Sequence, residues 1–473
     1  MREIRESIEN VKWRIVIVTH RKTFCIAFDP IRERVLNIMG VTDKTPGDSA
    51  SCSKGTLETY REIFRDLEPE VEIDGYEEEQ GSGRGDNYTA TIYRTHLTGQ
   101  RQSSADGKKQ KWEKNLICKR MPENVQRREA YKSDKLFRNE VLFYTEIMPE
   151  LLRFQEDKTS KVFGATPKCY YARDDLLIME DLRVRNFQMP DRQKGLTLEE
   201  THLVLKEMAQ FHALSLSYKF ENPAHFERLR EHITEGLFCS SNANWYKNYY
   251  ERLTKDAIKM VSEILPEDSK YLEAMKKFAG SSTFFSQMVH LVSAESTLSA
   301  ICHGDCWVNN FLYRYECTGD NTEQKRAVDV CLVDFQLIRY SSIALDIANL
   351  LFCCTTKAMR DEHLNGFIKL YTSELFGWLK LLCTNIPEVC DTTEKFAKLF
   401  RVELKEYGCF ALGLAMDIIP MSTCSSENAP DMYLNMHPDD IEAGAPILNF
   451  PPNDLCREKM SDIVIDMVDR GML

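Results

Sequence analysis

The sequence predicts an α+β fold of two lobes: a small, mostly antiparallel β-sheet lobe with one key helix, and a larger, mainly helical lobe. Three observations predict it. Strand-like segments recur between residues 71 and 119 and again at 176–182. One helical stretch, Arg127 to Met148, interrupts them. Helical periodicity then dominates from residue 197 onward, apart from short strands within 301–333.

The chain has 473 residues and a formal charge of −12, from 61 lysines and arginines against 73 aspartates and glutamates. This acidic balance argues against binding to nucleic acid or to an anionic membrane as the main function of the protein. The sixteen cysteines are scattered without metal-ligand spacing, and no signal peptide or membrane span is evident. We therefore expect a cytoplasmic protein with reduced thiols, no nucleic-acid or membrane partner and no obligate protein partner.

The expected boundaries place the small lobe at 51–182 and the helical lobe at 183–473. Residues 1–50 contain two strand-like runs but are expected to form a peripheral extension, because disorder concentrates at termini.

The small lobe begins with helical spacing at 57–64, followed by an alternating strand at 71–76 and a second strand at 89–94. A glycine-rich turn joins the two strands, and its candidate residues are Gly81, Gly83, Gly85 and Asn87. Glycines between antiparallel strands let backbone N–H groups approach phosphate oxygens without a Cβ in the way. The same pattern is also that of an ordinary hairpin turn, and Asp86 is an unusual neighbour for phosphate.

Lys119 ends an apolar strand, whereas the basic run Lys108–Lys111 is expected to be a solvated hairpin tip. Glu140 falls on the apolar stripe of the helix that begins at Arg127. A buried ammonium and a buried carboxylate each require a partner, so we expect Lys119 to pair with Glu140, as in the ion pair that aligns ATP phosphates in kinases. The alternative is that Glu140 lies at the solvated edge of the stripe.

The apolar strand at 176–182 runs into a polar link, where kinase-like folds have the hinge that hydrogen-bonds adenine. The backbones of Glu180 and Leu182 are the candidates for this contact. A capping box of Thr197 and Glu200 opens the next helix, and His212 on its apolar stripe is expected to be a core residue.

The segment 301–334 contains the candidate catalytic and metal-binding residues. His303-Gly304-Asp305 follows a short apolar run, Asn310 comes five residues after Asp305, and a second strand ends at Asp334. Carboxylates that end apolar strands are costly unless they face water, a proton or a metal. The order matches the kinase template, in which an aspartate accepts a hydroxyl proton and an asparagine and an aspartate hold Mg²⁺ beside ATP. We therefore expect Asp305 to be catalytic and Asn310 and Asp334 to be metal ligands.

The stretch HGDCWVNN followed by LVDFQLIRYSSIALDIANLL resembles the ecdysteroid kinase-like (CHK) family, which is related to aminoglycoside and choline kinases. GRGDNYTATIYR, LICKRMP, FRNEVLFYTEIMPEL and the C-terminal segment resemble the family as well, so the likeness extends from about residue 51 to the end. It implies a protein-kinase-like fold and an ecdysteroid or another lipophilic alcohol as phosphate acceptor.

Only eleven residues separate Asp334 from Asp346, and no A-P-E motif follows. Protein kinases need a longer segment to dock a peptide, so a small-molecule alcohol is the expected substrate. Asp346 is then expected to brace the catalytic loop. The aromatic-rich insertion at 216–300 is expected to be mostly core, with a minority of its residues lining an acceptor pocket. Two alternatives remain: a kinase for a cationic alcohol such as choline or an aminoglycoside, and a non-catalytic pseudokinase scaffold.

Overall fold

The small lobe is built on a five-stranded antiparallel sheet with the strand order β1-β2-β3-β5-β4. The computed structural model describes residues 56–473 except 82–89, 104–107, 124, 126–127, 130–131, 161–162, 281, 318–324 and 430–449, and except the side chains of Trp245 and Tyr246. The expectations for residues 1–50 and for Gly83, Gly85 and Asn87 lie outside the described residues.

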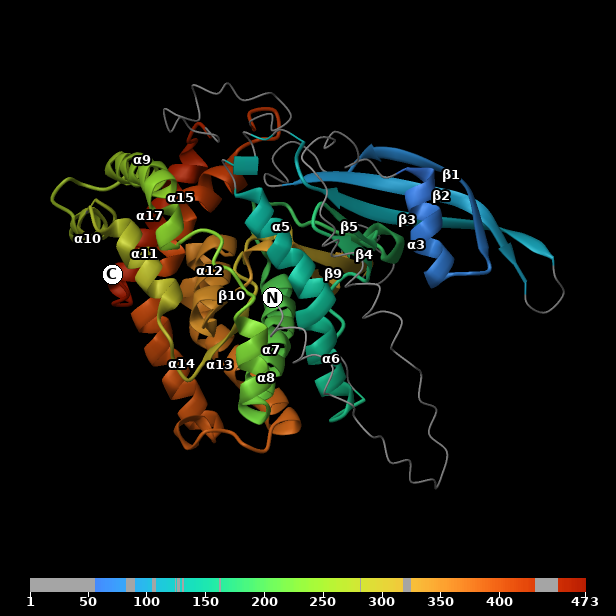
Figure 1. Ribbon diagram of the computed structural model, residues 1–473. Helices are drawn as coiled ribbons and strands as arrows, with labels where there is room; N and C mark the ends of the chain where they lie inside the picture. The colour runs from blue at the N-terminus through green and yellow to red at the C-terminus, as the bar shows by residue number, and fades with distance from the viewer. Residues whose placement is uncertain are drawn as a thin grey trace, which may run out of the picture. The chain divides into compact units, whose positions relative to one another are not determined.

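Helix α3 covers one face of this sheet (Figure 1). Tyr60 and Phe64, one helical turn apart, meet Leu97, Trp112 and Leu116 of the strands in a separate small core. The elements of the small lobe are α3 (Leu57–Leu67), β1 (Val71–Gln80), β2 (Thr91–Gln102), β3 (Lys109–Arg120), α5 (Ser133–Leu142), the π-helical turn η1 (Phe143–Ile147), α6 (Met148–Glu156), β4 (Cys169–Arg173) and β5 (Leu176–Glu180).

Two boundaries differ from the sequence expectation. The basic run was expected to be a hairpin tip, but Lys109 to Lys111 begin strand β3, where they are exposed. Strands β2 and β3 pair as far as Gln102 and Lys109, which accounts for the difference. Helix α5 begins at Ser133 because Lys132 adopts φ +52°, a left-handed conformation that cannot continue a helix.

The large lobe is mainly helical, with α7 packed against α13 (Figure 1). Its helices are α7 (Leu198–Glu221), α8 (Pro223–Arg230), α9 (Ala243–Ser262), α10 (Lys270–Ala279), α11 (Phe284–Ser293), α12 (Ile343–Cys354), α13 (Lys357–Leu382), α14 (Thr393–Tyr407), α15 (Phe410–Thr423) and α17 (Asp454–Asp469). Short 3₁₀ turns are η2 (Leu182–Arg185), η3 (Ser240–Asn242), η4 (Val308–Asn310), η5 (Phe335–Leu337) and η6 (Glu388–Cys390).

Two small sheets carry the segment that contains the candidate catalytic residues. One pairs β7 (Ser299–Cys302) with β10 (Arg339–Ser342). The other has the order β6-β8-β9 and comprises β6 (Phe187–Gln188), β8 (Phe311–Cys317) and β9 (Lys325–Leu332). The two-lobed α+β, kinase-like fold that the sequence predicts is therefore present.

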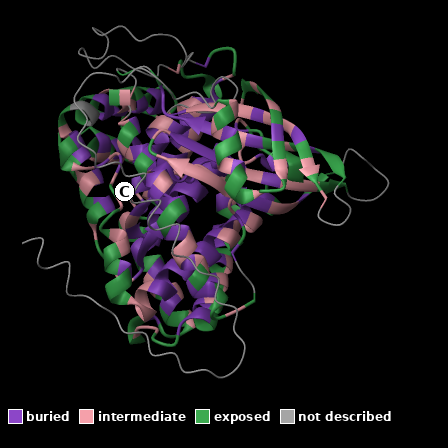
Figure 2. Ribbon diagram, turned by 45° about the vertical axis from the view of Figure 1, so that its right-hand side comes forward, coloured by how far each residue is buried: buried purple, intermediate pink, exposed green. Residues whose placement is uncertain are grey.

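Buried residues gather where the helices of the large lobe meet, whereas the outer end of the long strands is exposed (Figure 2). The expected core aromatics of the insertion, Tyr250, Phe284 and Phe285 among them, are buried. A buried ion pair of Arg360 with Asp466 fastens α17 to α13. Within the described residues, no helix is long and apolar enough to cross a lipid bilayer.

Candidate active site

Lys119 of β3 lies between two carboxylates. Its Nζ is 2.5 Å from Oε2 of Glu140 on α5 and 2.7 Å from Oδ1 of Asp334. The side chains of Lys119 and Glu140 are buried, so each charge depends on its partner. Burial by itself lowers the pKa of Lys119, but the charges of Asp334 and then Glu140 outweigh burial, and the net shift is upward. The lysine therefore stays charged, and the pair expected from the sequence is present.

Asp334 reaches Lys119 from a left-handed turn with φ +67° and ψ +66°. Aspartate tolerates this region better than most residues because its short polar side chain can bond locally. The ring of Phe335, next in the chain, stacks on Phe143 at a centroid distance of 3.7 Å. Phe143 begins the π-helical turn that follows α5, so the turn after Asp334 is packed directly onto the helix that carries Glu140.

The loop after β7 holds Asp305 next to Asn310. Nδ2 of Asn310 donates to the carbonyl and to Oδ2 of Asp305, each at 2.9 Å. The amide nitrogen is thus used within the loop, and the opposite atom, Oδ1, is the one suited to a cation. Gly304 has φ +85°, and a Cβ at this position would lie 1.8 Å from the carbonyl oxygen of Leu337. Only glycine fits this position.

The carboxyl group of Asp305 is perturbed by its surroundings. Burial, followed by the negative charge of Asp334, raises the pKa of Asp305 to about 7. A carboxyl group with a pKa near neutrality is suited to exchange a proton with a reacting hydroxyl group.

Asp346, at the start of α12, braces this loop as expected. Its Oδ2 accepts from the backbone N–H of His303 at 2.7 Å, and its Oδ1 accepts from that of Gly304 at 2.9 Å. Nε2 of His212 lies 3.1 Å from Oδ2, and Nδ1 of His212 lies 2.7 Å from the hydroxyl of Tyr371. His212 is therefore a buried and hydrogen-bonded core residue, also as expected. Cys302 lies nearby and forms a buried cluster with His212 and Asp346, whose ligand atoms lie within 4.8 Å of one another, but both Asp346 oxygens already accept hydrogen bonds from backbone amides.

A cavity of about 220 Å³ lies between the sheet and the β8–β9 hairpin. Seven of the expected residues line it together: Gly81, Lys119, Glu140, Glu180, Leu182, Asn310 and Asp334. Asp305 is not among the lining residues, but it is hydrogen-bonded to Asn310, which is. The structure thus brings the described candidates for nucleotide and metal binding to one place.

The hinge candidates differ in what their backbones offer. The N–H of Glu180 donates to the carbonyl of Lys168 at 2.8 Å, so it is engaged within the protein. Leu182 occupies the first position of η2, after an aspartate cap at Asp181. The N–H at this position has no partner within the helix, which suits a contact to a ligand.

Sequence reasoning missed several lining residues. The apolar walls are formed by Ile92, Ile117, Met179, Leu312 and Val333. Arg94 also lines the cavity, and its Nε lies 2.7 Å from Oδ2 of Asp181. Because side chains two residues apart in a strand share a face, the sequence could have placed Arg94 on the same face of the sheet as Ile92. Its partner across the sheet was not visible in the sequence.

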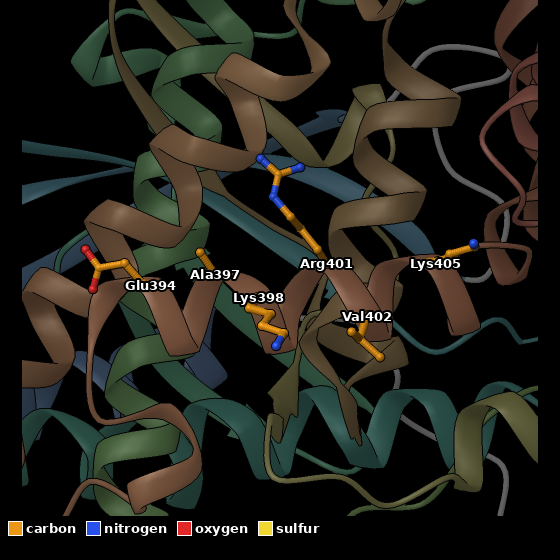
Figure 3. Close-up of a pocket in the computed structure, with 6 residues that line it drawn as sticks. All are labelled: Glu394, Ala397, Lys398, Arg401, Val402 and Lys405. Atoms are coloured by element: carbon orange, nitrogen blue, oxygen red, sulfur yellow. The ribbon is translucent and has the colours of Figure 1, made fainter.

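A second hollow, of about 420 Å³, runs along α14 and is unrelated to this site (Figure 3). The six labelled side chains all come from one helix and share no residue with the central cavity. Val402 is 52% exposed, and the charged neighbours repeat at helical spacing. This is a solvated helix face.

The sequence of the chain matches a known protein family. The model of the ecdysteroid kinase-like family matches residues 84–384, which is more than half of the chain. A solved ternary complex of APH(2″)-IIa with streptomycin and ATP shares 13% identity and a TM-score of 0.27, over 76% of this chain and 89% of that one. A TM-score this low supports no inference about the site. No protein with a curated description matches the chain. The family match shows that the chain belongs to the ecdysteroid kinase-like family and is a phosphotransferase acting on a hydroxyl group of a small molecule.

Proposed function

We propose that this protein transfers the γ-phosphoryl group of Mg·ATP to a hydroxyl group of a lipophilic alcohol, with an ecdysteroid or a related steroid or xenobiotic as the acceptor class. One observation carries the proposal. Lys119, Glu140, Asn310 and Asp334 converge on a single cavity, and Asn310 is hydrogen-bonded to Asp305 beside it. A phosphotransferase site needs these groups at such close range.

The donor set fits Mg²⁺. The carboxylate of Asp334 and Oδ1 of Asn310 are hard oxygen ligands, and Asn310 is oriented by its two bonds to Asp305. Bound there with ATP, the ion would neutralise charge on the β- and γ-phosphates.

The protein itself supplies the remaining charge and the shape. Lys119 presents its ammonium group to the phosphates, and Glu140 keeps it in place from α5. The apolar walls of the cavity suit an adenine ring, with the N–H of Leu182 as its hydrogen-bond donor. Gly81 lines the cavity, and a Cβ at this position would approach the side chain of Ile92 to 2.8 Å.

Asp305 acts on the acceptor. The acceptor oxygen forms a bond to the γ-phosphorus, the bond from that phosphorus to the bridging oxygen breaks, and ADP leaves with that oxygen. The hydroxyl proton passes to Asp305, whose raised pKa suits it to hold a proton. Most of the rate enhancement would come from positioning and charge stabilisation.

The short connection between Asp334 and Asp346 favours a small acceptor. Apart from Ile338, it is taken up by η5, β10 and the start of α12. These elements are packed into the lobe, which leaves no peptide platform of the kind that protein kinases carry. The pseudokinase alternative is disfavoured because the described cluster of charged residues is complete.

The test is mass-spectrometric detection of phosphorylated products from purified protein, Mg·ATP and a panel of ecdysteroids, choline, aminoglycosides and a generic protein substrate. Each reaction is run at low and at high salt. We expect phosphorylated ecdysteroid at a rate that changes little with salt, because apolar burial is not screened by ions. Product confined to a salt-sensitive cationic alcohol, or to the protein substrate, would contradict the acceptor class. Absence of a phosphorylated product from every compound in the panel would favour the pseudokinase.

A further inference from the structure

A larger cavity, of about 600 Å³, opens in the helical lobe. Three parts of the chain line it: the end of α8 with residues 231–240, helix α11 with Glu295, and strand β10. Its apolar wall consists of Ile233, Phe238, Val289 and Val292, with the ring of Tyr340. Its polar rim consists of Glu227, Arg230, Glu231, Glu235, Glu295 and Arg339.

The segment 231–240 is tied to the active site through Asn139, the neighbour of Glu140 on α5. The buried amide of Asn139 donates to the carbonyl of Thr234 at 2.7 Å and accepts from its N–H at 3.1 Å. The same Nδ2 lies 3.3 Å from the carbonyl of Gln336, two residues after Asp334. The segment that forms one wall of the cavity is therefore hydrogen-bonded to helix α5 of the small lobe, and the same amide also reaches the turn that follows Asp334.

Strand β10 makes a second connection. Arg339 pairs in register with Cys302, three residues before Asp305. Leu337, two residues before Arg339, packs against Gly304 so closely that no side chain fits there. The positive charge of Arg339 also contributes to the environment of Asp305. Strand β10, which forms one wall of the cavity, thus runs beside the strand that leads into the catalytic loop.

The rim carries four carboxylates and two guanidinium groups, and three of the carboxylates lie in ion pairs with these groups. Arg230 lies 2.5 Å from Glu227 and 2.7 Å from Glu295, and Arg339 lies 3.0 Å from Glu235. A cationic ligand would have to compete with these guanidinium groups for the carboxylates. An uncharged ligand with hydroxyl groups would instead donate to carboxylates and accept from guanidinium groups without breaking the pairs.

We propose that this cavity is the acceptor site and that it takes an uncharged, largely apolar molecule that carries several hydroxyl groups. The proposal rests on the proposed function, and it adds where the acceptor binds and which chemistry selects it. The apolar wall receives the body of the molecule, and the paired charges receive its hydroxyl groups. One hydroxyl group is then presented to Asp305.

Cys239 provides a reporter within the native chain, because it lines the cavity and is partly exposed. The exposed Cys317 on β8 does not line the cavity and serves as the internal control. The wild-type protein is alkylated with a maleimide in the presence of 20-hydroxyecdysone or of choline, and both peptides are followed by mass spectrometry. We expect the ecdysteroid, and not choline, to slow alkylation of Cys239 by at least about tenfold at saturation, while Cys317 is unaffected.

A matched pair of substitutions tests the same cavity by kinetics. Val289→Trp narrows the cavity, whereas Val402→Trp places the same bulk on the exposed face of α14 (Figure 3). We expect Val289→Trp to raise the KM for the alcohol at least about tenfold, with the KM for ATP and the cooperative unfolding retained. Val402→Trp should match the wild type.

The outcomes separate the two proposals. If the wild type phosphorylates an alcohol while Val289→Trp has unchanged kinetics and Cys239 is not protected, the cavity assignment is wrong and the proposed function stands. If the ecdysteroid protects Cys239 but no alcohol is phosphorylated, the cavity assignment stands and the proposed function fails. Protection by choline alone overturns the ligand class. If neither compound slows the alkylation of Cys239, the cavity assignment is contradicted, whether or not an alcohol is phosphorylated.

Discussion

Replacing Asp346 with asparagine tests whether the brace behind the catalytic loop positions Asp305. The wild-type carboxylate is buried and accepts from two backbone amides and from His212. Asparagine has nearly the same size but only one acceptor oxygen. Whichever way the amide is turned, its nitrogen faces at least one N–H donor, so the variant loses one or two of the three hydrogen bonds.

The cost follows from these contacts. A hydrogen bond to a charged group contributes roughly 1.5–3 kcal/mol, and a neutral one about 1 kcal/mol. Losing one bond outright and weakening the other two to neutral strength therefore costs about 2.5–7 kcal/mol. Most domains are stable by roughly 5–15 kcal/mol, so the variant should still fold. Because a displacement of about 1 Å can lower a rate about 100-fold, kcat should fall far more than the affinity for ATP.

The assay combines urea unfolding with steady-state kinetics on the best alcohol acceptor. Asp174→Asn, at the exposed turn between β4 and β5, is the matched control and should behave as the wild type. Tyr371→Phe removes only the hydroxyl group beside His212 and should have a smaller effect of the same kind. If Asp346→Asn keeps the wild-type unfolding midpoint and kcat, Asp346 does not brace the loop.

Four further predictions follow from the described geometry. Asp334→Asn should bind Mg·ATP much more weakly by calorimetry, and unchanged affinity would exclude Asp334 as a metal ligand. Asp305→Asn should retain ATP affinity while kcat falls by roughly 10²–10⁴-fold; a wild-type rate would refute its role. Arg360→Met leaves Asp466 buried with weaker partners and should cost about 3 kcal/mol in urea unfolding, whereas pairing it with Asp466→Leu should recover most of this loss. Burial raises the pKa of Asp417 from 3.8 to about 6, so the folded protein binds this proton more tightly than the unfolded chain and loses stability as pH rises through that interval. The unfolding midpoint of Asp417→Asn should therefore rise relative to that of the wild type as the pH is raised from 4 to 6. A difference between the two midpoints that stays constant would show that the pKa of the carboxyl group is not perturbed.

The sequence was informative wherever a charged residue stood on an apolar pattern. Lys119 and Asp334 end apolar strands and Glu140 lies on an apolar helical stripe, so each position indicated a charge that needs a partner. Short-range order was also predictable: the capping box of Thr197 and Glu200 is present at the start of α7. The roles assigned to these residues remain predictions.

What the sequence did not reveal depends on contacts between distant segments. The pair of Arg94 with Asp181 joins residues 87 positions apart, and neither residue interrupts an apolar pattern. The start of α5 is set by the left-handed backbone of Lys132, for which the sequence carries no turn signal such as glycine or asparagine. The cavity beside β10 is formed by three segments that periodicity describes only as helix, loop and strand.

The attachment of Asn139 has a consequence for how the enzyme is controlled. In many kinases the helix that carries the glutamate swings away to break the ion pair with the lysine and switch the enzyme off. Here such a swing would pull on residues 231–240, because Asn139 holds Thr234 by two hydrogen bonds. A ligand that steadies this segment would also steady the helix. If the alcohol binds in the cavity beside β10, as we propose, nucleotide and alcohol should each tighten the binding of the other, because coupling between sites is reciprocal. Substrate synergism, and not an external regulator, would then keep the enzyme from hydrolysing ATP when no alcohol is present.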